Sequence, residues 1–402
     1  MLRLHDNLLF IKDCPMKPAI AAGLALVLHI AAAGAVPFIP TSDSNVLERL
    51  PTRPNDPTAV ELRGLRAALA AAPKNAGAAV ALAERYFELA AAEGDPRYVG
   101  YAEAALRPWR TDDAPANVLY MRALLRQYRH DFDGALKDLD LTLRREPSHI
   151  GAHSWRAAIF MVRADYAAAA RDCAALAEEA SELRAVGCAA YVDATTGKTR
   201  EAYARLAGAL QRAADAGPDA TLWALTRLAE MAWRLEDPDG AEALFKRALS
   251  LGVDDNFLLA EYADFLLERG RPKEVVAMLK PWSRSDTLLL RLALAEKALD
   301  LREAEAHIQA LGDRFAAAAL RGERLHMGEE ARFLLDLKGD ARQALAVGLE
   351  NWKEQREPRD ALVVLEAAVA ARDPDAAAPA LRWLHDSRFE SERLKRLAAS
   401  LK

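Results

Sequence analysis

The chain has 402 residues, of which 52% are hydrophobic, 7% aromatic and 28% charged. This is the composition of a globular protein, and it excludes collagen, a coiled coil or a wholly disordered chain. The 54 Lys and Arg residues are outnumbered by 59 Asp and Glu, giving a formal net charge of −5. Without a broad positive field, nucleic acid is not an expected partner.

The N-terminal segment has the pattern of an export signal. Lys17 precedes an apolar core of Ala, Leu, Val and Ile, which ends in the small residues Ala33-Gly34-Ala35. This predicts a signal peptide over residues 1–35 that is cleaved after Ala35, with Met16 as an alternative start. The core is also long enough to be an uncleaved single-span anchor. We therefore expect a periplasmic protein or, in the alternative, one anchored in the inner membrane.

Five prolines fall within about twenty residues after this segment, which predicts an extended linker over residues 36–58. From residue 59 onward, apolar residues recur at i, i+3, i+4 and i+7, and no run alternates with a period of two. Ala, the best helix former, dominates this part of the chain. The sequence predicts an all-α domain over residues 59–402.

The helical pattern repeats with a period of 34 residues. Small or apolar residues recur at this spacing in two in-phase pairs of segments: Ala123, Ala135 and Leu139 recur as Ala157, Ala169 and Cys173, and Ala229, Ala241 and Phe245 recur as Ala263, Val275 and Leu279. A period of this length indicates a helix, a turn and a second helix in each unit.

The stretch ANVLYMRALLRQYRHDFDGALKDLDLTLRREP, residues 116–147, resembles the tetratricopeptide repeat, with Ala123 and Ala135 at the helix crossing and Pro147 closing the unit. The resemblance implies a right-handed α-solenoid of stacked antiparallel helix pairs, a tetratricopeptide-like superhelix. The clearest units span residues 116–149, 150–182, 183–216, 222–255 and 256–284. Residues 59–115 and 285–402 form degenerate units, the outermost of which act as caps.

In this family the first helix of each unit lines a concave groove that holds peptides or partner segments. Position-by-position transfer of that property predicts a groove lined by Asn117, Tyr120, Gln127, Tyr128, Ser154, Met161, Trp223, Glu230, Trp233, Arg234, Phe257 and Asp264. Aromatic and Arg side chains are the usual anchors of interfaces. The alternative for Trp223 and Trp233 is packing between neighbouring units.

The familiar patterns of catalytic and metal sites are absent from the sequence. Gly197-Lys198-Thr199 lacks the leading glycine of a phosphate-binding loop, so we expect an inter-helix turn. His149 and His153 are spaced i, i+4 near Glu146, but no Cys or inward-facing carboxylate is expected to complete a metal site, so a loop His and a helix-start His at an ordinary turn are expected. We therefore expect no catalytic activity, no metal and no cofactor.

Cys173 and Cys188 lie on consecutive helices, at nearly equal distances from the turn between them. In an oxidising compartment this arrangement is compatible with a disulfide, provided that the Cα atoms come within about 7 Å. Two buried thiols that act as small hydrophobic groups are the alternative.

These patterns together predict a non-catalytic, exported helical-repeat scaffold or adaptor that binds a protein or peptide partner in its concave groove. The alternative is a membrane-tethered assembly factor for envelope biogenesis or polysaccharide export, held by an uncleaved N-terminal anchor. The identity of the partner is not encoded in the sequence.

Overall fold

The computed structural model describes residues 42, 56–93, 97–323 and 325–401. The predicted signal peptide lies outside the described residues, as does most of the predicted linker. The chain divides into two compact units, Met1–Ala59 and Val60–Lys402, and the second contains nearly all of the described structure. None of the described helices has the length and apolar character needed to cross a membrane.

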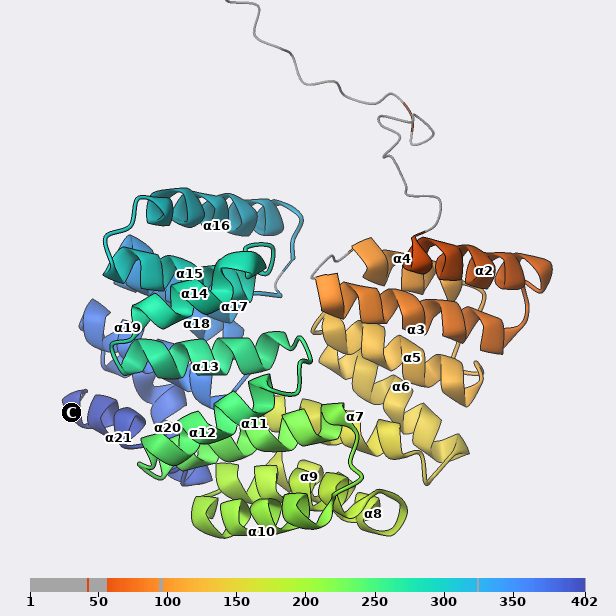
Figure 1. Ribbon diagram of the computed structural model, residues 1–402, viewed down its shortest axis with the longest axis horizontal. Coiled ribbons are helices and arrows are strands. Elements are labelled where there is room, and N and C mark those ends of the chain that lie inside the picture. Colours follow the sequence, from red (N-terminus) through yellow and green to blue (C-terminus); the bar gives the residue numbers. More distant parts are fainter. Residues whose placement is uncertain (1–41, 43–55, 94–96, 324, 402) are drawn as a thin grey trace, which may run out of the picture. The chain divides into compact units, whose positions relative to one another are not determined.

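The described chain is all-helical, and successive helices pack in antiparallel pairs, as predicted (Figure 1). The helices are α2 (Pro57–Ala71), α3 (Ala76–Glu93), α4 (Arg97–Ala105), α5 (Ala116–Tyr128), α6 (Phe132–Arg145), α7 (Ile150–Val162), α8 (Tyr166–Glu179), α9 (Glu182–Thr195), α10 (Thr199–Arg212), α11 (Pro218–Arg234), α12 (Pro238–Leu249), α13 (Asn256–Glu268), α14 (Pro272–Leu279), α15 (Asp286–Ala298), α16 (Glu303–Leu320), α17 (Met327–Arg332), α18 (Ala341–Asn351), α19 (Pro358–Ala371), α20 (Ala378–Ser387) and α21 (Glu392–Ser400). Short helical turns extend α14 (Lys280–Trp282), α17 (Phe333–Lys338) and the start of α20 (Asp375–Ala377).

Small residues allow the two helices of a pair to lie close together. Ala123 of α5 and Ala135 of α6 are fully buried, as are their counterparts Ala157 of α7 and Ala169 of α8. A methyl group at the crossing keeps the helix axes about 8 to 10 Å apart, and larger side chains fill the seams on either side. The residues that repeat every 34 positions are therefore the ones that form the core.

The turn inside several pairs is built in the same way. A residue in the left-handed region is followed by an aspartate whose carboxylate accepts a hydrogen bond from an N–H in the first turn of the second helix. This arrangement recurs at His130 with Asp131, Ala164 with Asp165, Glu236 with Asp237, and Gly339 with Asp340. The repeated cap fixes the point at which each second helix begins.

The C-terminal helices lie against the middle of the repeat array, far from them in sequence. The indole Nε1 of Trp383 in α20 donates to the hydroxyl of Tyr166 at the start of α8, at 2.7 Å. The backbone N–H of Arg356 donates to the carbonyl of Val162 at the end of α7, also at 2.7 Å. Ala164 packs against the hydrophobic core of α18 to α21.

A second set of contacts ties the turn between α20 and α21 to α10 and α11. Glu390 accepts a hydrogen bond from the backbone N–H of Thr199 at 2.8 Å, and its carbonyl accepts one from Nε of Arg234 at 3.1 Å. The Arg234 guanidinium also lies 3.9 Å from the centre of the Phe389 ring. The turn at Gly197, with φ of +85°, leaves room for Arg388, because a Cβ there would lie 3.0 Å from it.

Candidate functional site

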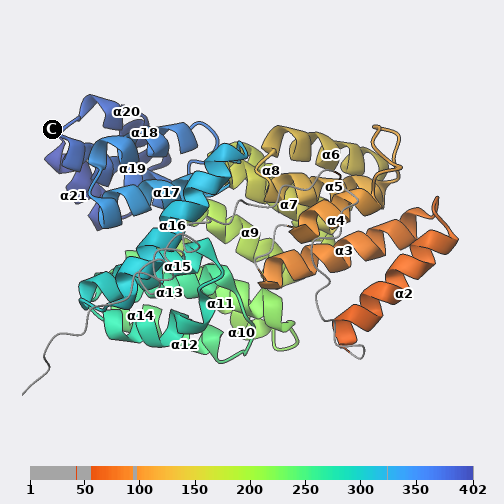
Figure 2. The same cartoon turned by 90° about the horizontal axis from the view of Figure 1, so that it is seen from above.

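The inner helices surround a cavity of about 1590 Å³. Its walls come from the first helix of almost every pair, namely α3, α5, α9, α11, α13, α15, α17 and α19, together with the end of α16 and residues of α21. In Figure 2 the C-terminal helices α18 to α21, drawn in blue, lie above α13 to α15 in the view. Sites for small molecules are usually about 300 to 1,000 Å³, so this cavity has room for a larger ligand.

Charged side chains dominate the cavity walls, and most of them are paired. Fifteen carboxylates and eleven arginines line the cavity, which leaves an excess of acidic groups. On α13, Asp264 binds Arg291 of α15 and Arg332 of α17, each at 2.7 Å. Burial opposes the ionisation of Asp264, but the two arginines outweigh it and lower the pKa of its carboxyl.

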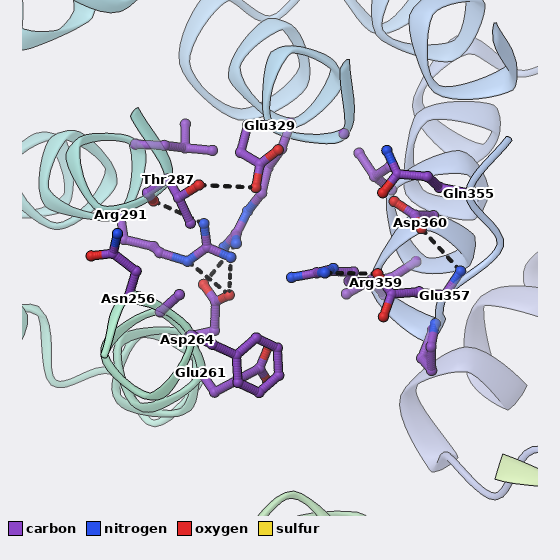
Figure 3. A pocket seen from close by; sticks show the side chains of 18 of the residues that line it. Asn256, Glu261, Asp264, Thr287, Arg291, Glu329, Gln355, Glu357, Arg359 and Asp360 are labelled. Carbon is purple, nitrogen blue, oxygen red and sulfur yellow. Dashed lines mark hydrogen bonds and ion pairs between the residues drawn. The ribbon is translucent and has the colours of Figure 1, made fainter. Parts of the chain in front are cut away.

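The opposite wall is formed by the start of α19. Glu357 and Asp360 form a reciprocal capping box there, and Arg359 binds Glu357 at 2.7 Å. Burial and the neighbouring Glu357 raise the pKa of Asp360 to about 7, although Asn351 donates a hydrogen bond to its carboxyl at 2.9 Å. The Arg359 side chain is 45% exposed, and Figure 3 shows it reaching into the open space opposite Glu261 and Asp264.

Arg227 of α11 is held between aromatic rings. Its guanidinium lies 4.3 Å from the centre of the Tyr191 ring and 4.4 Å from that of Phe257, a geometry that favours cation–π attraction. It also binds Glu230 at 2.9 Å, one turn further along the same helix. Arg227 therefore neutralises Glu230 and fixes two aromatic walls of the cavity.

Glu261 of α13 differs from its neighbours because it forms no hydrogen bond or ion pair with any described residue, although it is not exposed. Burial, reinforced by the nearby carboxylates of Glu230 and Asp264, raises the pKa of Glu261 to about 8. At neutral pH its carboxyl is therefore mostly protonated in the empty cavity.

The structure brings seven of the twelve predicted groove residues together around this cavity: Gln127, Tyr128, Glu230, Trp233, Arg234, Phe257 and Asp264. The other five, Asn117, Tyr120, Ser154, Met161 and Trp223, are not among the lining residues. Arg234, although it lies on the cavity wall, is also engaged by Glu390 and Phe389 from the C-terminal segment.

The five remaining residues have other surroundings. Met161 is buried in the core between α7, α8 and α9, and Tyr120 packs against the His149 ring, with 4.6 Å between ring centres. Trp223 lies over Gly187, where a Cβ would approach its ring to 2.6 Å. The Ser154 hydroxyl donates to the Ile150 carbonyl at 2.9 Å. Asn117 is exposed near the start of α5, outside the cavity lining.

The end of α7 lies against the C-terminal part of the chain. Its last turn contacts Arg356, and the turn that follows packs against the C-terminal core. Ser154 and Met161 also lie on α7, and Met161 is buried against α8 and α9. The sequence prediction transferred groove positions from one repeat to the next. It could not foresee the different surroundings of α7, because it assumed that the first helix of every unit faces an open groove.

Two further residues on the cavity wall, Arg227 and Glu261, are not among the twelve predicted groove residues. The 34-residue period could have found them, because Trp223, Arg227 and Glu230 recur as Phe257, Glu261 and Asp264. Glu357 and Arg359 also line the cavity, but they belong to the degenerate C-terminal units, in which the sequence shows no clear 34-residue period.

The histidines, the Gly197 turn and the cysteines that the sequence singled out all contribute to the structure of the helix pairs. His149 accepts a hydrogen bond from the N–H of Ala152 at the start of α7, and His153 lies 2.7 Å from the buried carboxylate of Asp172. Gly197 and Lys198 form the turn between α9 and α10. Cys173 and Cys188 are joined as a disulfide between α8 and α9, with a Cα–Cα distance of 5.3 Å.

Comparison with known proteins gives structural similarities only. No protein-family model matches the chain, and no curated protein matches it. Similar solved structures include PilF of Pseudomonas aeruginosa (19% identity, 50% of this chain and 92% of that one, TM-score 0.38). A tetratricopeptide repeat protein of Parabacteroides merdae is also similar, with 15% identity over 71% of this chain and 98% of that one and a TM-score of 0.28. Yeast Tom70 has 12% identity over 85% of this chain and 86% of that one, with a TM-score of 0.39. From its own helix pairing and 34-residue period, the chain has an all-helical repeat fold of the tetratricopeptide-like kind.

Proposed function

We propose that this protein is a non-catalytic scaffold or adaptor that holds a segment of a protein or peptide partner in the cavity between its inner helices. The observation that carries the proposal is the cavity of about 1590 Å³, lined by the first helices of successive pairs. It offers aromatic and arginine side chains, which commonly anchor interfaces. Its size favours a peptide segment over a small metabolite.

Affinity capture with the full chain tests this proposal. Glu236→Lys combined with Asp254→Lys reverses two exposed charges on the cavity lining, and we expect it to abolish capture of the partner. Glu178→Lys combined with Glu179→Lys makes the same change on the exposed face of α8, away from the cavity, and should have no effect. Native circular dichroism of both variants is the control for folding. Equal capture by the two variants would refute the cavity as the binding site.

We further propose that the protein is exported and acts in the periplasm. The proposal depends on the basic, apolar and small-residue pattern that ends at Ala35. N-terminal sequencing of the protein isolated from a periplasmic fraction should begin at Val36. Retention in the membrane fraction with residues 17–36 intact would instead support an inner-membrane anchor.

A further inference from the structure

Counted over the described residues, Glu261 is the one charged lining side chain that is not exposed and yet has no bonded partner. The neighbouring acidic groups are neutralised, because Arg227 binds Glu230 at 2.9 Å and Arg291 binds Asp264 at 2.7 Å. The cavity therefore contains one inner carboxylate that forms no direct ion pair with any described cation of the chain.

Arg359, which reaches into the open space opposite Glu261 in Figure 3, is already engaged. The Arg359 guanidinium binds Glu357 at 2.7 Å and lies 5.7 Å from the centre of the Phe257 ring. Because carboxylates outnumber arginines fifteen to eleven around the whole cavity, the charge balance favours a positively charged ligand group. Leu267 and Leu290, on neighbouring helices, add apolar surface to the same lining.

We propose that Glu261 is the docking point for a lysine or arginine side chain carried by the peptide segment that enters the cavity. This rests on the proposed function and specifies the chemistry of the partner. The cation would form a charge-assisted hydrogen bond with the Glu261 carboxylate. The aliphatic stem of the same side chain would lie along the apolar part of the wall.

Docking of a cation at Glu261 should be coupled to release of a proton. The Glu261 carboxyl has a pKa of about 8, because burial, Glu230 and Asp264 raise it more than Arg359 and Arg291 lower it. The other charged groups on the walls around it are Arg227 on α11, Glu329 and Arg332 on α17, and Glu357 on α19. A lysine, with an ordinary pKa near 10.4, stays charged between pH 6 and 9. Affinity should therefore rise with pH across this range.

The test uses fluorescence anisotropy with the full chain and a fluorescein-labelled peptide of four Gly-Lys repeats. We expect Glu261→Gln to weaken binding at least about tenfold, as for loss of a charge-assisted contact. Glu178→Gln, which removes the same charge from the exposed face of α8, should leave the Kd within about twofold. A matched peptide of Gly-Glu repeats should not bind.

Calorimetric titration in two buffers of different ionisation heat provides a second readout. The wild-type chain should release a proton on binding the lysine peptide at pH 7, and Glu261→Gln should not. Failure of the wild-type chain to bind the lysine peptide, or equal losses in Glu261→Gln and Glu178→Gln, would overturn the proposal. If Glu261→Gln still captured the natural partner while the Glu236→Lys and Asp254→Lys variant did not, the cation assignment would fail and the cavity would remain the binding site.

Discussion

At the scale of the residue, the clearest feature is the small side chain at each helix crossing. Ala157 of α7 is buried against α8, where any added carbon atoms would meet neighbouring helices. Its neighbour Ala158 is exposed on the same helix. The two positions are adjacent and chemically identical, so they separate the effect of packing from that of helix propensity.

We expect Ala157→Leu to lower the free energy of unfolding by about 1 to 3 kcal/mol, because overpacking forces neighbouring side chains away from their preferred rotamers. Ala158→Leu should change it by less than about 0.5 kcal/mol. Urea unfolding followed by circular dichroism measures both. A native-like stability for Ala157→Leu would show that the helix register is wrong.

The unpaired Glu261 should also make stability depend on pH. Its folded pKa of about 8 exceeds the ordinary value of 4.5, so the folded chain holds a proton that the unfolded chain releases between these values. Stability therefore falls as pH rises from about 4.5 to 8. Glu261→Gln should remove this loss and be more stable than wild type at pH 8 by on the order of 1 to 3 kcal/mol. The urea unfolding midpoints of the wild-type chain and of Glu261→Gln at pH 4 and pH 8 test this. A difference between the two proteins that is the same at both pH values would contradict it.

At the scale of the element, the disulfide joins two helices that belong to different repeat units. It connects α8 to α9 across a sequence separation of 15 residues. The level positions of the two cysteines could be predicted from the turn between them, but not the direction in which the side chains point. The free energy that such a link adds comes mainly from restricting the unfolded chain.

Protein purified from an oxidising compartment without reductant should therefore have a mass lower by two hydrogens than the reduced protein. Reduction should lower the free energy of unfolding by about 3 kcal/mol, as expected for a loop of this length. A Cys173→Ala and Cys188→Ala variant is the control, since its stability should not respond to reductant. An oxidised sample with the full reduced mass would show that the thiols are free.

The antiparallel pairing of helices was predictable from the 34-residue period of the sequence, and the structure shows such pairs from α5 to α14. Seven of the predicted groove positions meet at one cavity because the first helices face inward. The degenerate units after residue 285 gave no register, so the contribution of α19 to the cavity could not be foreseen. Burial of Met161 depends on tertiary contacts that no local pattern encodes.

At the scale of the whole described array, the return of the C-terminal helices determines which part of the inner face stays open. Trp383 contacts Tyr166 across a sequence separation of 217 residues, and Glu390 contacts Thr199 across 191. These contacts hold the C-terminal segment against α8 and α10, and the cavity is lined by helices from α3 to α21. The sequence alone could not place the C-terminal segment, because its docking depends on a few polar side chains with no periodic pattern.

A double-mutant cycle tests this return. We expect Tyr166→Phe and Trp383→Phe to be coupled by about 0.5 to 1.5 kcal/mol in the free energy of unfolding, the usual contribution of one hydrogen bond. Trp383→Phe combined with Tyr101→Phe, a change on exposed α4, should be additive. No coupling between Tyr166 and Trp383 would mean that the C-terminal helices do not dock on α8 in solution.

The central claim is that a partner segment enters the cavity, and site-specific photo-crosslinking tests it most directly. Benzoylphenylalanine in place of Phe257 puts the reactive benzoyl group, at the para position of the ring, on the cavity lining. The same residue in place of Tyr101, which is 51% exposed and outside the lining, is the matched control. We predict that the natural partner crosslinks through position 257 and not through position 101. Crosslinking only from position 101, or equally from both, would contradict the cavity as the binding site.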